Sequence, residues 1–281
     1  MEQVTFQVIL KQFNYCLALS LVFMLACKPS PQTKPLEAGS AYDSALTDSL
    51  AFAKVLDSIR RTIPHDAKPV MGYRFRVNGD FDGDGTKEML AEYYRGMDLK
   101  AEMPKFYDST VTYEQLMAVA WNRKAYSYGV TGKANIRPLV FSNSARQLGL
   151  AWLHNEGDLD GNGTDELSYV INWADWSSTN LCHVMTYRNQ RWEKLLEIPI
   201  WEWQLPELPL TYSQYGLFGI EAMMVDNPML EEAKTAEDSL KHFKGFIRRI
   251  KPGMIIIHYR NTEACEDSLR IDLMSEIPKL Y

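Results

Sequence analysis

Two segments of the chain repeat the same pattern of acidic residues and glycines. Residues 79–90 read GDFDGDGTKEML and residues 157–168 read GDLDGNGTDELS, so seven of the twelve positions are identical. In each copy an oxygen-bearing side chain stands at every second position. Counted from the first Asp of each loop, positions 1, 3, 5, 7 and 9 are Asp80, Asp82, Asp84, Thr86 and Glu88 in the first copy, and Asp158, Asp160, Asn162, Thr164 and Glu166 in the second.

This spacing predicts a binding site for a hard divalent cation in each loop. A tightly coiled loop turns alternate side chains inward, and glycines at positions 4 and 6 permit backbone angles that other residues resist. The carbonyl at position 7 and the carboxylate at position 9 bring the set to about five or six oxygens, which suits Ca²⁺ better than Mg²⁺. Because the first loop has Asp84 where the second has Asn162, we predict that the first loop binds the ion more tightly.

The loops differ from an EF-hand and resemble another kind of calcium loop. An EF-hand carries a bidentate Glu at position 12 between two helices, whereas position 12 here is Ala91 or Tyr169 and the flanking sequence is strand-like. With an acid at position 9, the loops resemble those of FG-GAP repeats, known from integrin alpha-subunit propellers and many bacterial surface proteins. The resemblance covers each loop and the strand after it. It implies that the two sets of five residues are two ligand sets for structural calcium.

Two other interpretations of the loops stay open. One is an acidic, glycine-rich hairpin turn that holds no ion. The other is enzymatic, because the run from Asp82 to Thr86 (DGDGT) resembles the DxDxT signature of phosphatases of the haloacid dehalogenase family. That resemblance implies Asp82 as nucleophile, Asp84 as acid/base and Mg²⁺ as cofactor. The signature requires a buried apolar strand before it, whereas residues 76–81 read RVNGDF, and the second copy replaces its second Asp with Asn162.

A separate candidate for ligand contact lies in a polar loop. Residues 175–180 read DWSSTN and carry one aromatic side chain, Trp176. Aromatic faces can stack on sugar rings or hold a protein partner, and recognition residues concentrate on loops. Trp176 is therefore the predicted ligand contact, whereas Trp192, which lies in a strand pattern, is predicted to fill the core.

The segments that carry these residues are predicted to be mostly strands. Short runs rich in Tyr, Trp, Val and Ile stand between turn residues, as is typical of strands. They are Tyr73–Val77, Glu88–Tyr94, Gln147–His154, Glu166–Trp173, Leu181–Arg188 and Trp192–Ile198, with a hairpin turn at 188–191 and a closing hairpin of Met254–Arg260 and Ser268–Met274. Helical spacing of apolar residues predicts a helix over Leu46–Ile63 and a second candidate over Met229–Phe243.

The predicted fold class is mainly β, with antiparallel hairpins in a propeller-like or β-sandwich body. Residues 45–281 would form this single domain, with the first helix at its N-terminus.

The N-terminus predicts export and a lipid anchor. Lys11 precedes an uncharged, largely apolar run over 15–26 (YCLALSLVFMLA). This run is shorter than the about 20 residues of a membrane-spanning helix but suits a signal peptide. It ends in Ala26-Cys27, which resembles the lipobox of bacterial lipoproteins and implies removal of residues 1–26 and lipidation of Cys27. Residues 27–44, with three prolines, would be a flexible tether. The alternatives are a plain signal peptide cut near Ala26 and a short buried segment.

Composition limits the partners and leaves one disulfide open. The chain has 30 basic and 36 acidic residues and a net charge of -6. This charge argues against a protein that coats nucleic acid and against attraction to anionic headgroups, so membrane attachment would come from the lipid. Cys182 and Cys265 can pair in an exported protein, but their spacing does not decide whether they do.

Together these features predict an exported, lipid-anchored calcium-binding protein in the periplasm or on the cell surface. It would act as a non-enzymatic binding or scaffolding module of the cell envelope, with an unknown protein or glycan partner. The alternatives are a carbohydrate-binding accessory lipoprotein and a metal-dependent phosphatase or hydrolase.

Overall fold

The computed structural model describes most of the body of the chain. The described residues are 39–96, 101–107, 110–144, 146–175, 177, 179–206, 208, 240, 243–260, 266–274 and 279–280. The chain divides into two compact units, Met1–Lys54 and Val55–Tyr281. The signal segment, Cys27, Trp176 and Cys265 lie outside the described residues, as does almost all of the predicted helix over Met229–Phe243.

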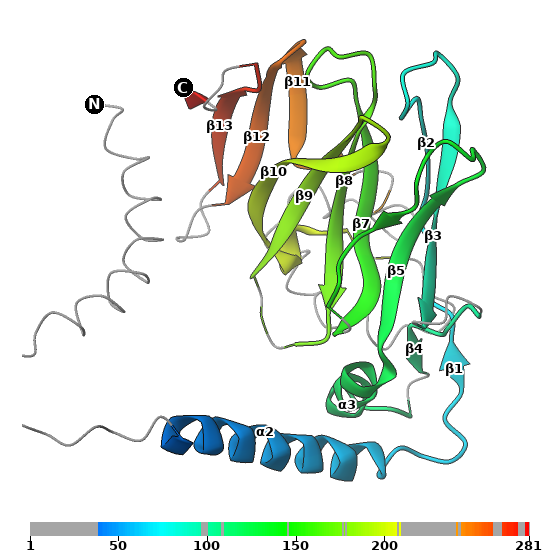
Figure 1. Cartoon of the computed structure of the whole chain (residues 1–281), viewed down its shortest axis with the longest axis vertical. Coiled ribbons are helices and arrows are strands. Elements are labelled where there is room, and N and C mark those ends of the chain that lie inside the picture. The colour runs from blue at the N-terminus through cyan, green and yellow to red at the C-terminus, as the bar shows by residue number, and fades with distance from the viewer. Residues whose placement is uncertain are drawn as a thin grey trace, which may run out of the picture. The chain divides into compact units, whose positions relative to one another are not determined.

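The prediction of a mainly β fold built from antiparallel hairpins is confirmed (Figure 1). One four-stranded sheet consists of β2 (Arg76–Gly79), β3 (Glu88–Gly96), β5 (Ala125–Thr131) and β6 (Leu139–Val140). A second is the meander β7 (Gln147–Gly157), β8 (Glu166–Trp173), β9 (Thr179–Arg188) and β10 (Arg191–Trp201). A third consists of β11 (Ile247–Lys251), β12 (Met254–Arg260), β13 (Glu266–Asp272) and β14 (Lys279–Leu280). The short strands β1 (Pro69–Val70) and β4 (Phe106–Tyr107) pair with each other.

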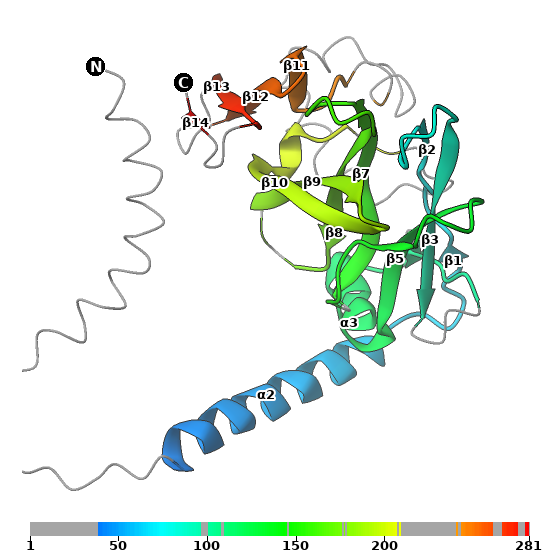
Figure 2. The same cartoon turned by 45° about the horizontal axis from the view of Figure 1, so that its top comes forward.

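The three larger sheets share one hydrophobic core, as in a β-sandwich. The core cluster takes Leu90 from β3, Leu150 from β7 and Ile255 from β12, all almost fully buried. Figure 2 shows β12 close to β10, and the two strands are in contact. Trp192, predicted to fill the core, is partly buried and packs against it, with its ring 5.1 Å from that of Tyr187. Among the described residues, none of these sheets closes into a barrel.

Local turn chemistry explains the hairpins that were predicted. Residues Asn189 and Gln190 connect β9 to β10 with φ of 51° and 60°. Two successive residues with positive φ form the kind of turn whose twist matches that of antiparallel strands. The hairpin predicted at 188–191 is therefore confirmed, with Arg188 paired to Arg191. The strand predicted over Tyr73–Val77 lies slightly later, at Arg76–Gly79.

Helices account for the main differences from the predicted elements. Helix α2 spans Gly39–Arg60, so it begins before the predicted Leu46 and covers residues 39–44 of the predicted tether. Helix α3 (Tyr113–Arg123) was not predicted. The sequence signal of this helix is the capping box formed by Thr112 and Gln115. The Thr112 hydroxyl accepts a hydrogen bond from the Gln115 amide at 3.4 Å, and the Gln115 side chain accepts one from the Thr112 amide at 2.9 Å. Neither described helix has the length and apolar character needed to cross a membrane.

A buried ion pair lies where the first sheet meets β7. The Lys105 side chain is 1% exposed and that of Glu92 is fully buried. The Lys105 ammonium lies 2.8 and 2.9 Å from the two Glu92 carboxylate oxygens, and donates to the Tyr73 carbonyl at 2.7 Å. Burial lowers the pKa of Lys105, although the Glu92 charge opposes this shift.

The Glu92 carboxylate also joins strands of different sheets. Glu92 lies on β3, and its carboxylate accepts hydrogen bonds from the Phe75 amide at 3.2 Å and from the Ser127 hydroxyl of β5 at 2.8 Å. It also accepts one from the Leu150 amide of β7 at 3.0 Å. One buried carboxylate thus holds the first sheet to the second, and it sits in the same hairpin that carries the first acidic loop.

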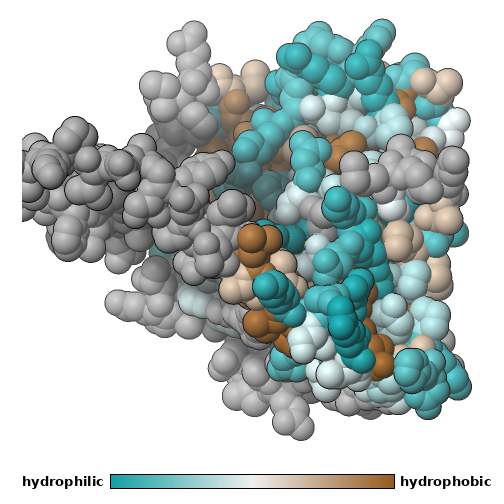
Figure 3. Space-filling model, turned by 60° about the horizontal axis from the view of Figure 1, so that its bottom comes forward, coloured by the Kyte–Doolittle hydropathy of each residue, from teal (hydrophilic) through white to brown (hydrophobic). Residues whose placement is uncertain are grey.

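The surface has no single dominant apolar region in the view of Figure 3. Hydrophobic residues there stand in small groups among hydrophilic ones. Exposed large apolar side chains occur at scattered positions of the described chain, for example Met71, Val140 and Ile250. Scattered exposed apolar residues are normal on folded proteins and do not by themselves indicate a docking surface.

Candidate metal centre

Each repeated segment forms the turn of a β-hairpin. The first joins β2 to β3, and the second joins β7 to β8. The glycines at positions 4 and 6 of both loops have positive φ, between 75° and 90°. Residues with a Cβ rarely adopt this conformation, so the glycines allow the coil that the sequence predicted.

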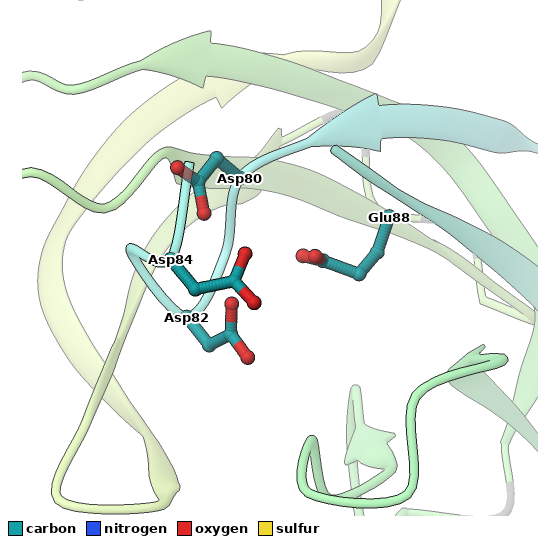
Figure 4. A group of neighbouring side chains, drawn as sticks. All are labelled: Asp80, Asp82, Asp84 and Glu88. Carbon is teal, nitrogen blue, oxygen red and sulfur yellow. The ribbon is translucent and has the colours of Figure 1, made fainter. Parts of the chain in front are cut away.

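In the first loop the acidic side chains converge on one centre (Figure 4). Asp80, Asp82, Asp84 and Glu88 each offer a carboxylate oxygen, and these oxygens all lie within 4.8 Å of one another. The carboxylates of Asp82 and Asp84 point toward that of Glu88, which is buried at the start of β3. Such a cluster of hard oxygens can hold a metal ion.

A lysine from another part of the chain enters this cluster. The Lys133 ammonium lies 2.9 Å from Asp82 Oδ1, 2.6 Å from Asp84 Oδ2 and 2.8 Å from Glu88 Oε1. The hydrogen bonds that Lys133 donates to the carboxylates of Asp84 and Glu88 hold the pKa of Lys133 above its usual value. Asn135 also donates to Asp82 Oδ2, at 2.7 Å. Lys133 and Asn135 belong to the β5–β6 connection, far from the loop in sequence, and no local pattern pointed to them.

The second cluster is smaller and more deeply buried. Asp158, Asp160 and Glu166 also offer oxygens within 4.8 Å of one another. Glu166 is 0% exposed, and its Oε2 accepts a hydrogen bond of 2.6 Å from the Leu159 amide. Its other oxygen, Oε1, is buried and has no hydrogen-bond partner. Burial raises the pKa of Glu166 to about 7, against smaller opposite effects of the Thr186 hydroxyl and the Leu159 amide.

Arg188 makes an ion pair with the second cluster. Its guanidinium contacts Asp160 through one carboxylate oxygen, Oδ2. The other oxygen of Asp160 accepts a hydrogen bond from the Asn162 amide at 3.0 Å. The Arg188 side chain is 40% exposed, so the contact lies at the edge of the cluster. Glu166 Oε1 remains without a partner.

The predicted ligands that are not carboxylates make contacts within their own loops. Asn162 Oδ1 accepts hydrogen bonds from the amide and the hydroxyl of Thr164, at 2.6 and 2.5 Å. The Thr86 amide donates to Asp84 Oδ1 at 2.9 Å. These contacts hold the coil of each loop.

The two loops lie side by side, which the sequence did not reveal. The Asp80 amide donates to Asp165 Oδ2 at 3.0 Å, and the Asp165 amide donates to the Asp80 carbonyl at 2.8 Å. A Cβ added to Gly83 would lie 3.1 Å from the Thr164 methyl group. On its other side, the second loop meets the β11–β12 turn, where the Gly253 amide donates to the Leu159 carbonyl at 2.8 Å. The second loop therefore contacts turns of both other large sheets.

The remaining predicted site residues are only partly described. Cys182 is buried in β9, and burial raises the pKa of its thiol. Its candidate disulfide partner, Cys265, and the candidate ligand contact, Trp176, lie outside the described residues, so both predictions stay open.

Comparison of the chain with protein-family models, with curated proteins and with solved structures found no match. The function must therefore be argued from the geometry of the two loops.

Proposed function

We propose that the chain binds divalent cations at its two acidic hairpin loops. The observation that carries this proposal is the buried Oε1 atom of Glu166, which has no hydrogen-bond partner and lies in a cluster of three carboxylates. An unpaired buried carboxylate oxygen is costly, because it has lost its water without gaining another partner. A cation among Asp158, Asp160 and Glu166 would supply that partner.

Calcium is the ion that this chemistry favours. The clusters offer carboxylates, with no His or Cys among the converging side chains, and carboxylate oxygens suit Mg²⁺, Ca²⁺ and Mn²⁺ rather than softer metals. Magnesium keeps several of its own waters, whereas Ca²⁺ accepts six to eight oxygens from a flexible protein loop. The resemblance of both loops to FG-GAP calcium loops supports the same choice.

The proposed role of the ion is structural. The second loop contacts the first loop and the β11–β12 turn, so an ion there would hold together turns from three sheets. Extracellular calcium modules bind with dissociation constants of about 10⁻⁴ to 10⁻³ M, which fits an exported protein. We therefore propose a lipid-anchored, calcium-stiffened binding or scaffolding module of the cell envelope, without enzymatic activity.

Calcium is expected to raise the thermal stability of the purified protein. At a free Ca²⁺ concentration about ten times the dissociation constant, the stabilisation should be about 1.4 kcal/mol per occupied site. The measurement is thermal unfolding in chelator and in millimolar CaCl₂, with MgCl₂ at the same concentration as a control for ionic strength. Glu166→Gln keeps the shape of the side chain and removes its charge, and it should lose the part of the shift due to the second loop. An equal shift in wild type and in Glu166→Gln would contradict the proposed second site.

The lipid anchor has a separate test. Replacing Cys27 with serine is expected to abolish incorporation of labelled fatty acid in a bacterial host, because acylation requires the thiol. The protein should then leave the membrane fraction. Cys16→Ser is the matched control, since it removes a thiol from the predicted signal peptide and should leave labelling unchanged. Labelling that persists in Cys27→Ser would refute the lipoprotein proposal without affecting the calcium sites.

A further inference from the structure

The two loops differ in how their negative charge is neutralised. In the first, the Lys133 ammonium bonds three of the four carboxylates, with distances of 2.6 to 2.9 Å. In the second, Arg188 contacts a single carboxylate oxygen. Each cluster also keeps one buried carboxylate oxygen without a hydrogen-bond partner, Asp80 Oδ1 in the first and Glu166 Oε1 in the second. A cationic group of the protein therefore lies among the carboxylates of the first cluster but only at the edge of the second.

A metal ion and the Lys133 ammonium cannot occupy the first cluster together. Calcium lies 2.3 to 2.6 Å from its oxygen ligands, and the ammonium already approaches Asp82, Asp84 and Glu88 almost as closely. Two positive charges on the same oxygens would also repel each other. An ion can bind there only after the Lys133 side chain has moved away.

The β5–β6 connection keeps Lys133 close to the loop. Two residues after Lys133, the Asn135 carbonyl accepts a hydrogen bond of 2.7 Å from the Tyr187 hydroxyl. The Arg137 carbonyl accepts one of 2.9 Å from the Trp192 indole. These contacts fix the backbone on both sides of residue 136, so a displaced Lys133 side chain stays close to the loop and competes continuously with the ion.

We propose that Lys133 is a built-in competitor for calcium, so that the second loop fills first and the first loop fills only at higher Ca²⁺ concentration. This inference rests on the proposed function. It reverses the order of calcium affinity predicted from Asp84 and Asn162, in which the first loop binds more tightly. The reason is that the Lys133 ammonium offsets the additional carboxylate of the first loop. The chain would then respond to Ca²⁺ in two steps, the second of which releases the Lys133 side chain.

The test is calcium titration by calorimetry in a Glu166→Gln background, in which the first loop is the remaining site. Adding Lys133→Met should tighten binding by at least about tenfold, since the competing charge at the centre is gone. Lys87→Met is the matched control, because Lys87 is an exposed residue of the same loop and its loss changes the net charge equally. Its effect should stay below about threefold, because exposed charges are screened by solvent. Lys133→Gln, which keeps a hydrogen-bond donor, provides a second variant if Lys133→Met does not fold.

The outcomes separate this inference from the proposal on which it rests. Tighter binding in Lys133→Met and in Lys133→Gln, but not in Lys87→Met, supports the inference. Equal affinity with and without Lys133, or an equal gain in Lys87→Met, overturns it and leaves calcium binding intact. If neither the wild type nor any Lys133 variant binds calcium at millimolar concentration, both the inference and the proposed function are wrong.

Discussion

Replacing Lys105 with methionine is expected to lower the free energy of unfolding by about 3–5 kcal/mol, the usual effect of removing one partner of a buried ion pair. The Glu92 carboxylate is fully buried and would lose the ammonium that now contacts both of its oxygens. Methionine fills a similar volume, so the loss would reflect charge and hydrogen bonding rather than a cavity. Equilibrium unfolding in urea at constant pH measures the difference.

A second substitution in the same pair provides the control. Glu92→Gln removes the charge and keeps one oxygen, which can accept either from the Phe75 amide in the place of Oε2 or from the Leu150 amide in the place of Oε1. Combined with Lys105→Met, it should cost clearly less than the sum of the two single changes, because no unpaired charge remains. Additive losses would mean that the pair itself contributes little and that the surrounding hydrogen bonds dominate.

Replacing Gly149 with alanine is expected to destabilise the protein by about 3 kcal/mol or more. Gly149 has φ of +93°, a conformation that side chains with a Cβ rarely adopt, and its Cβ would lie 2.0 Å from Lys105 Cε. The Lys105 side chain cannot move aside freely, because its ammonium is held by Glu92 and by the Tyr73 carbonyl. The alanine would therefore either displace the buried ion pair or shift β7.

Urea unfolding of Gly149→Ala and of Gly132→Ala compares a crowded glycine with an open one. A Cβ at Gly132 would meet no atom within 4 Å, so that change should stay within about 0.5 kcal/mol. In a Lys105→Ala background the clash disappears, and the additional cost of Gly149→Ala should fall to the backbone strain, about 1–2 kcal/mol. An unchanged cost in that background would locate the effect in the β7 backbone rather than in the ion pair.

Both substitutions affect strands of the hairpins that carry the two loops and still test something separate from the proposed metal sites. Glu92 lies in β3, which begins at Glu88 of the first loop. Loss of the pair would weaken the contact of the first sheet with β7, and the hairpins that carry the two loops belong to these two sheets. Calcium added to Lys105→Met should therefore recover part of the lost stability, because an ion that binds only the folded state favours it.

Much of the framework was predictable because it depends on neighbouring residues. Alternating and aromatic-rich runs predicted most strands of the second and third sheets, and polar or glycine-rich segments between them predicted the hairpins. The sequence patterns did not predict the helix α3 or the strands β1, β4, β5, β6, β11 and β14. Residues 125–131 (AYSYGVT) contain Gly and Ser that weaken a strand pattern, and the local signal of α3 is its capping box. In both cases packing against neighbouring elements adds to a weak local preference.

The two acidic loops follow from local sequence, because their chemistry lies in a dozen consecutive residues whose glycines permit one coil and whose alternate carboxylates then face inward. Their surroundings depend on the packed fold: the contact between the loops through Asp80 and Asp165, the ammonium of Lys133 within the first cluster, and the unpartnered oxygen of Glu166 in the second. These residues meet because strands pair in a particular register and sheets pack in a particular arrangement. That arrangement depends on the free energy of the whole core and leaves no pattern in any single segment.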